Sequence, residues 1–417
     1  MTPEIKQRIE QIRRGEVPER YVKTALGLAP ANWKRYTFGD IYTERKEPGD
    51  ENLPLLMVSI HSGVSDGEVD AAELPKQVKR IEDKSQYKKA VSGDLVFNMM
   101  RAWQGAIGTV RTTGMVSPAY IVAEPNDKAY PLFMDYYSRT PQMINQIDRQ
   151  SYGVTDFRKR LYWDSFAPIG CILPPIEEQQ KIATILTTQD KVIELKEKRL
   201  AEKQRQKKYF MQQLLTGKKR LPGFSGEWKK TKLKNILYER KTYSPKGLEY
   251  PHVTLSAEGI FPKSERYDRD HLVRDEDKEY KITHKGDICY NPANLKFGAI
   301  CENTFGDAIF SPIYVTFEVE ENICKEYIAN YLMRWDFINA VRKYEEGTVY
   351  ERMAVKPEDF LKFEIFLPQI EEQAAIAEVL STADREIELL QQDIEQEKQK
   401  KKALMQLLLT GIVRVKT

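Results

Sequence analysis

The side chains best suited to a chemical task in this sequence are forked or amide groups set among aromatic residues. One such group in the first half of the chain is Asn98, Arg101, Trp103 and Gln104. A second group surrounds Gly153 and consists of Tyr152, Thr155, Arg158, Lys159 and Arg160. Arg, Lys, Asn and Gln are the residues that hydrogen-bond to base edges in the major groove of DNA. We therefore predict that both groups lie on loops that contact DNA.

The second half of the chain carries counterparts of these groups by position. They are Asn291, Asn294 and Lys296, and then Thr348, Tyr350 and Arg352 after Gly347. For any single residue, a solvated surface charge or a structural amide is an equally good interpretation, so the prediction concerns the groups. Phosphate contacts should outnumber base contacts and fall on basic residues near these loops. The candidates for phosphate contact include Lys79, Arg80, Lys88 and Lys89.

No pattern of catalytic residues is complete. The string Asn291-Pro292-Ala293-Asn294 partly matches the Asn-Pro-Pro-aromatic motif of amino-methyltransferases, but its third and fourth residues differ and no glycine-rich cofactor loop precedes it. No G-x-x-x-x-G-K-[ST] loop for an ATP-driven motor is present. The four cysteines and four histidines form neither C-x-x-C nor H-x-x-x-H pairs. We predict no catalytic residue, no metal site and no disulfide framework.

The elements that position these groups follow from an internal repeat. The stretch from Leu173 to Gly217 returns 194 residues later as Leu367 to Gly411, with 22 of 45 aligned positions identical. Shorter strings between the copies also match, such as G-D-L-V-F-N from Gly93 with G-D-I-C-Y-N from Gly286. The unit is one globular α+β domain plus one long helix, used twice. The predicted divisions are a helical segment at 1–30, domains at 31–172 and 218–366, and helices at 173–217 and 367–417.

Both repeated stretches show the 4-3 spacing of a coiled coil. The predicted apolar seam is Ile182, Leu186, Ile193, Leu200, Phe210 and Leu214 in the first helix, and Ile376, Leu380, Ile387, Leu390, Ile394, Leu404 and Leu408 in the second. The charges from Ile176 to Arg220 sum to +6 and those from Ile370 to Arg414 to −3, which favours pairing of the two helices with each other. The glutamate pairs at 177–178 and 371–372 fall in the first helical turn and suit the helix dipole or a partner contact.

The length of the helices determines how they run. A helix of about 40 residues is roughly 60 Å long, whereas a domain of about 150 residues is somewhat under 40 Å across. The second domain leaves the end of the first helix and enters the start of the second, so those two ends must be close. We predict an antiparallel pair with an approximate two-fold axis, a geometry that suits a target of two half-sites along a duplex.

Composition places the chain among globular proteins of two to four domains. It has 417 residues, 41% of them hydrophobic, and a net charge of +3. The N-terminal stretch is charged and no apolar run reaches about 18 residues, so we expect neither a signal peptide nor a membrane span. The expected location is the cytoplasm, in association with the nucleoid.

With these residues in view, the sequence resembles the specificity subunits of type I restriction-modification systems over essentially its whole length. The resemblance rests on the L-P-P-x-E-E-Q-type openings at Leu173 and Leu367, the L-L-T-G endings at Gly217 and Gly411, and the strings from Gly93 and from Ser117 (S-P-A-Y). The second domain departs from the first after Asn291, which implies two unlike half-sites.

The resemblance implies a non-catalytic DNA-recognition subunit with two target-recognition domains, each reading one half of a bipartite asymmetric site. It further implies two methyltransferase subunits for adenine methylation and two motor-nuclease subunits for restriction as partners. S-adenosylmethionine, ATP and Mg²⁺ would be needed only by those partners. Two other interpretations stay open at this point: a self-sufficient DNA methyltransferase or nuclease, and a coiled-coil scaffold that binds only proteins.

Overall fold

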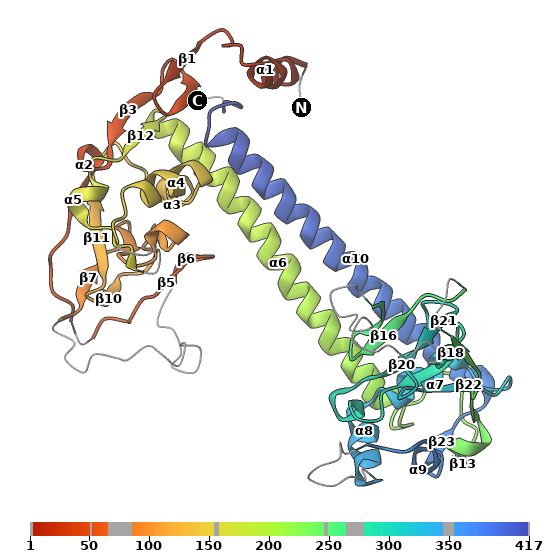
Figure 1. The fold of residues 1–417 in the computed structure, drawn as a ribbon. Coiled ribbons are helices and arrows are strands. Elements are labelled where there is room, and N and C mark those ends of the chain that lie inside the picture. The colour runs from red at the N-terminus through yellow and green to blue at the C-terminus, as the bar shows by residue number, and fades with distance from the viewer. Residues whose placement is uncertain are drawn as a thin grey trace. The chain divides into compact units, whose positions relative to one another are not determined.

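The computed structural model describes residues 3–50, 52–65, 86–153, 158–245, 249–263, 279–344 and 354–415. Contacts within the chain divide it into two compact units. Unit 1 comprises Met1–Leu195 and Ile394–Thr417, and unit 2 comprises Lys196–Asp393. Each unit therefore holds one domain together with one part of each long helix (Figure 1).

Unit 1 begins with a helix and continues as a mixture of short strands and helices. Its elements are α1 (Pro3–Arg13), β1 (Tyr21–Thr24), β2 (Gly27–Pro30), β3 (Lys34–Thr37), α2 (Phe38–Ile41), β4 (Tyr42–Glu44), β5 (Val58–Ser59), β6 (Gly63–Val64), β7 (Lys88–Ala90), β8 (Leu95–Asn98), the 3₁₀ turn η2 (Ala102–Gln104), β9 (Ile107–Thr109), β10 (Gly114–Val116), β11 (Tyr120–Pro125), α3 (Pro131–Tyr137), α4 (Pro141–Arg149), α5 (Trp163–Phe166), β12 (Gly170–Leu173) and the start of α6 (Ile176–Leu214).

The centre of unit 1 is a four-stranded antiparallel sheet in the order β4-β11-β8-β9. All four residues of β8 are buried, and Phe97 pairs with Ile121 on one side and Ile107 on the other. One apolar core joins this sheet to α3, α4 and the first turns of α6, where Ile182 and Leu186 are fully buried. The start of α6 is therefore part of the domain core.

Unit 2 repeats this plan. Its elements are the end of α6, β13 (Lys229–Lys232), η4 (Leu233–Asn235), β14 (Leu237–Glu239), β15 (Tyr243–Pro245), β16 (Val253–Ser256), β17 (Gly259–Pro262), β18 (Glu279–Thr283), β19 (Ile288–Tyr290), η7 (Leu295–Phe297), β20 (Ile300–Glu302), β21 (Ala308–Phe310), β22 (Val315–Val319), α7 (Lys325–Leu332), α8 (Trp335–Val341), η8 (Arg342–Tyr344), α9 (Pro357–Phe360), β23 (Glu364–Leu367) and the start of α10 (Ile370–Leu408). Its main sheet, β14-β22-β19-β20, has the same order as that of unit 1.

The helices α6 and α10 are each 39 residues long and pair antiparallel within both units. In unit 1, the Gln189 side chain donates to Glu397 (2.6 Å). In unit 2, Lys196 pairs with Asp393 at 2.8 Å and Lys203 with Glu386 at 2.5 Å. Numbers rise along one helix as they fall along the other, which confirms the predicted antiparallel coiled coil. These cross-helix pairs also explain the opposite net charges of the two helices.

The predicted seam positions lie on the covered side of each helix. Ile182, Leu186, Ile193, Leu214, Ile376, Leu380, Ile394 and Leu408 are buried, and Leu200, Phe210, Ile387, Leu390 and Leu404 are half-buried. The half-buried set falls mainly in the middle of the helices, away from the domains. There the helices cover only each other, so each seam residue keeps part of its surface in water.

The N-terminal segment 1–30, expected to be helical, is a helix only as far as Arg13. It continues as the β1–β2 hairpin, in which Tyr21 pairs with Pro30. The segment is fastened to the end of α10: the Tyr21 hydroxyl donates to the Gly411 carbonyl (2.6 Å), and the Arg8 guanidinium donates to the Ile412 carbonyl (3.1 Å). The sequence pattern alone did not indicate the hairpin, because Gly27 closes it without an alternation of apolar residues.

Candidate nucleic-acid interface

The loop that follows β8, residues 98–105, presents two of the predicted DNA-contacting side chains. Asn98 is buried, and its side-chain oxygen accepts the backbone N–H two residues later at 2.9 Å. The loop then forms η2 and closes at Gly105, whose φ of 104° is a conformation that glycine adopts without strain. Asn98 thus shapes the turn, whereas Arg101 and Gln104 are exposed.

Trp103 joins this loop to the second predicted group. Its indole N–H donates to the Met100 carbonyl (3.0 Å), and the Lys159 ammonium lies 5.2 Å from the ring centroid. Lys159 also pairs with Asp148 at 2.8 Å. The two groups that the sequence analysis selected in the first domain are therefore side by side, and Lys159 and Trp103 link them.

The second group is folded back on itself as a narrow loop. The backbones of Tyr152 and Arg160 exchange hydrogen bonds of 2.9 and 2.7 Å. Gly153 lies so close to the Arg158 backbone that a Cβ there would come within 2.5 Å of the carbonyl carbon. Tyr152 is 60% exposed and Arg158 is also exposed. Thr155 lies outside the described residues.

The equivalent loop of unit 2, residues 291–298, has the same turn with different side chains. Asn291 is buried, and its side-chain oxygen accepts the backbone N–H of Ala293 (3.1 Å) and of Asn294 (3.3 Å). Asn294 is exposed, and Lys296 is half-buried with its ammonium 5.4 Å from the ring centroid of Phe297. Thr348, Tyr350 and Arg352 lie outside the described residues.

Two exposed aromatic rings in unit 2 were missed by the sequence analysis. Phe297 is 62% exposed and Trp335 is 60% exposed. A gapless comparison of the two loops would have revealed the first, because Phe297 occupies the position of Gln104. No local signal could have revealed Trp335, because it lies 38 residues further along the chain.

The strand that leads into each loop begins next to a buried aspartate, which is paired with an arginine. Arg45 donates to both carboxylate oxygens of Asp94 (2.8 and 3.2 Å), and Arg240 does the same to Asp287 (2.9 and 3.0 Å). Burial raises the pKa of the Asp94 carboxyl, and the hydrogen bonds from Arg45 oppose that rise. The arginines belong to a string that occurs in both halves of the chain, Glu-Arg-Lys at 44–46 and at 239–241, and the aspartates belong to the repeated Gly-Asp strings at 93–94 and 286–287. The pairs therefore give a structural reason for both repeated strings.

The repeated helix openings and endings meet in a buried cluster, which we call the helix-end clasp. In unit 1 it consists of Trp33, Glu178 and Arg414. Glu178 is 1% exposed and accepts two hydrogen bonds from Arg414, both 2.7 Å, and one from the Trp33 indole at 3.2 Å. The neighbouring Gln179 fastens the helix to the domain by accepting the Tyr130 N–H (2.9 Å).

The helix-end clasp of unit 2 consists of Trp228, Glu372 and Arg220. Arg220 donates to both oxygens of Glu372 at 2.5 and 2.6 Å, and the Trp228 indole donates at 3.3 Å. Gln373 accepts the Cys324 N–H at 3.1 Å. A bidentate arginine–carboxylate pair fixes orientation as well as charge, so each clasp holds the start of one helix against the end of the other.

The glutamate pairs at the helix openings therefore need a corrected interpretation. Their first members, Glu177 and Glu371, are exposed as expected for a helix dipole or a partner contact. Their second members, Glu178 and Glu372, are buried by the clasps, so they are not available to a partner. Sequence reasoning missed this because Arg414 lies 236 residues from Glu178.

A model of the type I restriction modification DNA specificity domain matches residues 72–204 and again residues 226–399. The chain belongs to the family of type I restriction-modification specificity subunits. This confirms the resemblance drawn from the repeated motifs, and with it sequence recognition of DNA as the function.

Similar proteins from this family match nearly the whole chain. A putative type I restriction enzyme specificity subunit of Methanocaldococcus jannaschii, MjaX, is 24% identical over 442 residues, covering 96% of this chain and 98% of that protein. The MjaVIII specificity subunit of the same organism is 24% identical over 364 residues, covering 80% and 83%. The similarity to these two specificity subunits therefore extends over most of the length of each chain.

Solved structures show the same fold. The S subunit of a type I restriction-modification system from M. genitalium superposes with a TM-score of 0.53 at 10% identity, covering 93% of this chain and 97% of that one. A chain from a study of complex assembly and conformational transition of the type I R-M system gives a TM-score of 0.53 at 16% identity, covering 92% and 99%. At these identities the likeness supports the fold alone.

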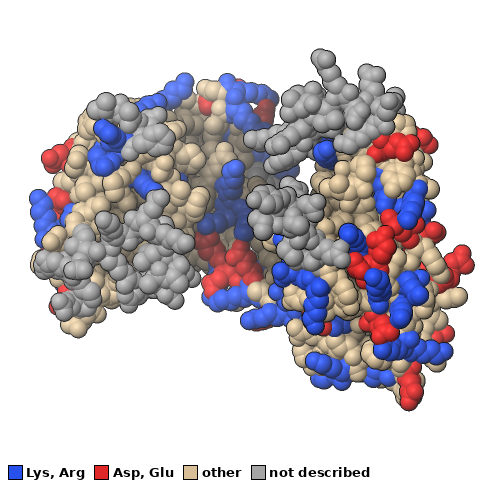
Figure 2. All heavy atoms as spheres, turned by 60° about the horizontal axis from the view of Figure 1, so that its bottom comes forward, with Lys and Arg blue, Asp and Glu red and all other residues tan. Residues whose placement is uncertain are grey.

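The surface charge of this specificity subunit is mixed. Figure 2 shows Lys and Arg side chains on both units, with Asp and Glu among them. Of the predicted phosphate contacts, Lys88 donates to the Tyr120 carbonyl at 2.8 Å, and burial lowers its pKa. Lys89 pairs with Glu47 at 3.0 Å. Both lysines are thus engaged within the fold, and Lys79 and Arg80 lie outside the described residues.

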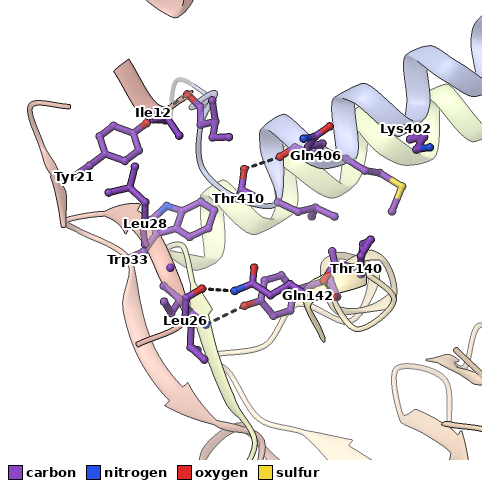
Figure 3. A pocket seen from close by; sticks show the side chains of 18 of the residues that line it. Ile12, Tyr21, Leu26, Leu28, Trp33, Thr140, Gln142, Lys402, Gln406 and Thr410 are labelled. Atoms are coloured by element: carbon purple, nitrogen blue, oxygen red, sulfur yellow. Dashed lines mark hydrogen bonds between the residues drawn. The ribbon is translucent and has the colours of Figure 1, made fainter. Parts of the chain in front are cut away.

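A cavity of about 770 Å³ lies in unit 1 beside the N-terminal hairpin. Figure 3 shows Tyr21, Leu26 and Leu28 on one side, and Gln406 of α10 with Thr410 just after that helix on another. The Gln142 side chain closes part of it by donating to the Leu26 carbonyl. The cavity thus lies among the N-terminal hairpin, α4 and the end of α10, all within unit 1.

The partial methyltransferase motif at Asn291 is part of a turn in the structure. The Asn291 oxygen is occupied within its turn, and no group of three or more His, Cys, Asp or Glu suited to a metal ion occurs in the described part of the chain. Cys171, Cys289 and Cys301 are buried free thiols, and burial raises the pKa of Cys171 to about 12. Among the described helices, none is long and apolar enough to cross a membrane.

Proposed function

We propose that each domain of this specificity subunit reads one half of a bipartite, asymmetric DNA site. The observation that carries the proposal is one loop framework presented twice with different side chains. In both units a buried asparagine shapes a turn and a left-handed glycine ends a 3₁₀ segment. The exposed positions differ: Arg101 and Gln104 in loop 98–105 correspond to Asn294 and Phe297 in loop 291–298. Like frameworks with unlike surfaces suit half-sites of different sequence.

In this proposal, Arg101 and Gln104 contact base edges, because their side chains are exposed and the turn beneath them is fixed. Tyr152 and Arg158 are further candidates on the neighbouring loop. Lys159, Arg160 and Trp103 fit a supporting role, since Lys159 bridges Trp103 and Asp148. Base contacts by Thr155, Thr348, Tyr350 and Arg352 stay predictions from the sequence.

We further propose that the chain has no catalytic activity of its own. Two methyltransferase subunits and two motor-nuclease subunits would supply adenine methylation and DNA cleavage, with S-adenosylmethionine, ATP and Mg²⁺ bound by those partners. The complex would act on DNA in the cytoplasm, in association with the nucleoid. Support comes from the family membership and from the absence of a complete cofactor motif in the sequence.

The decisive experiment is methylome sequencing of cells that express the chain with its methyltransferase subunit. The wild type should give one bipartite motif. Arg101→Ala and Gln104→Ala should each relax base preference within one half of it, at a cost of about 1 to 3 kcal/mol for a bidentate contact. Asn294→Ala should relax only the other half.

Two results would contradict the proposal. Loss of methylation that is uniform over both halves would reassign Arg101 and Gln104 to phosphate contact or to folding. Methyl transfer by the purified chain without a methyltransferase subunit would contradict the non-catalytic role. An Asn291→Ala variant serves as the control for the second result, because Asn291 lies in the partial methyltransferase motif.

A further inference from the structure

Phe297 and Trp335 are exposed aromatic residues on neighbouring elements of unit 2, η7 and α8. They are 62% and 60% exposed, whereas Tyr290, Phe317 and Phe360 of the same domain are fully buried. A Cβ on Gly298, the residue after Phe297, would come within 3.9 Å of the Trp335 ring, so Trp335 lies next to this loop. Large apolar side chains exposed together mark a binding surface more often than chance exposure does.

Both rings are held on rigid backbone. The turn before Phe297 is anchored by Leu295, which is fully buried, and it ends at Gly298 with φ of 84°. Trp335 is the first residue of α8, and the preceding Arg334 donates to the Leu215 carbonyl at 3.1 Å. The backbone that carries each ring is therefore anchored to the domain, so binding need not order these two segments.

The position of Phe297 identifies the ligand. It occupies the place that Gln104 has in loop 98–105, and the Lys296 ammonium lies 5.4 Å from its ring, which suits a polyanion beside an apolar contact. Equivalent loops on equivalent domains should meet the same groove of the duplex. Arg and Gln read bases chiefly in the major groove, so loop 291–298 should lie there too. In that groove the 5-methyl group of thymine is the apolar feature that tells one base pair from another.

We propose that Phe297 reads a thymine of the second half-site by apolar contact with its 5-methyl group. This deepens the proposed function and rests on it: the first domain recognises bases through hydrogen bonds, and the second recognises at least one base through an aromatic ring.

The test uses the full chain with its methyltransferase subunit and duplexes that carry the motif found by methylome sequencing. Thymines of the second half-site are replaced one at a time by uracil, which removes the methyl group and keeps base pairing. At one position the wild type should bind about fourfold more weakly, the factor that corresponds to about 0.8 kcal/mol for one buried methyl group at 1.4 kcal/mol per tenfold.

Phe297→Ala should bind the thymine and uracil duplexes equally, at the weaker level. Phe297→Gln, which installs the residue type of the first loop, should also lose the difference. Gln104→Ala is the matched control at the equivalent position of unit 1, and it should keep the fourfold difference. Phe297 and Gln104 are both exposed, so circular dichroism should show unchanged folding for all three variants.

Three outcomes would overturn the proposal: a second half-site without any A·T pair, a wild type that is indifferent to uracil at every position, or a Phe297→Ala variant that keeps the thymine preference. A Phe297→Ala variant that binds all duplexes normally but fails to join the methyltransferase subunit would also overturn it, in favour of a protein contact. Failure of the proposed function looks different, since the wild type would then show no sequence preference in either half-site.

Discussion

Unit 1 and unit 2 fasten their helices by the same three residue types but present different loops to solvent. The Glu178 and Glu372 carboxylates each accept two hydrogen bonds from an arginine and one from a tryptophan indole. Loops 98–105 and 291–298 share a backbone turn but differ at their exposed positions. In each clasp the glutamate is buried, so removing one of the three side chains leaves a polar group without its partner. The loop tips face water and tolerate substitution.

The two units also differ in how far they cover one equivalent strand, which is β12 in unit 1 and β23 in unit 2. Ile172 in unit 1 is 7% exposed and packs with Ala29 of the N-terminal segment and with Trp33. Its counterpart in unit 2, Phe366, is 54% exposed. Unit 1 has a hairpin over this strand, and unit 2 is entered through a shorter connection from α6. The repeat thus fixes the framework, and segments outside the repeat decide which apolar surface is covered.

The largest expected effect comes from ending the chain at Asp393. This removes from unit 1 the buried Ile394, Leu408 and Leu409 together with Arg414, but leaves unit 2 its own part of α10. Each fully buried side chain of this size contributes about 1.5 to 3 kcal/mol to stability. The free energy of unfolding of unit 1 should therefore fall by about 5 kcal/mol or more. Hydrogen exchange should show peptides of unit 1 unprotected and those of unit 2 protected. An equal loss of protection from hydrogen exchange in both units would mean that the two units do not fold independently.

The next effect tests whether the two clasps are equivalent. Arg220→Ala and Arg414→Ala each leave a buried glutamate without its charged partner. We expect the free energy of unfolding to fall by about 2 to 3 kcal/mol in either variant. This is less than the ~3 to 5 kcal/mol for breaking a fully buried pair, because both arginines are partly exposed. Urea unfolding followed by unit-specific hydrogen exchange measures it. Lysine in place of either arginine should restore part of the stability. If only one of the two alanine variants is destabilised, the clasps are not equivalent.

A smaller effect separates the glycines that end the two helices. Gly217 and Gly411 have φ of 69° and 70°, so alanine at either site costs about 1 kcal/mol in backbone strain. At Gly411 a Cβ would also lie 2.5 Å from the Pro30 ring, whereas at Gly217 it would only touch Trp228 at 3.4 Å. Gly411→Ala should therefore destabilise more than Gly217→Ala in thermal unfolding. Equal shifts in melting temperature would show that the N-terminal segment moves aside at no cost.

The smallest effect concerns the charge pairs across the helices. Lys203–Glu386 in unit 2 and Lys401–Asp190 in unit 1 are both 2.5 Å long and partly exposed. Such pairs contribute about 0.2 to 1 kcal/mol, and salt screens them. Double-mutant cycles with alanine should give a similar small coupling in each unit, reduced at high ionic strength. A coupling well above 1 kcal/mol for one pair would mark that part of the coiled coil as the anchor of the helix pairing.

The sequence by itself determined the repeat, the two long helices, their antiparallel pairing and the positions of the loops. Heptad spacing is a local property, and the antiparallel order follows from the length of a domain compared with that of a helix. The two groups of the first domain, around Arg101 and Tyr152, also lie together as loops. Asn98 and Asn291 were predicted to contact DNA, but their side chains are buried and hydrogen-bond to the backbone of their own turns.

The tertiary structure decided what depends on residues far apart in the chain. Arg414 reaches Glu178 across 236 positions, and Arg220 reaches Glu372 across 152, so no local pattern showed that these glutamates are buried. The exposure of Trp335 beside Phe297 depends on how α8 packs against a loop 38 residues before it. Periodicity along the sequence reports which face of one element is apolar, but the neighbour that covers or leaves open that face is fixed only when the chain folds.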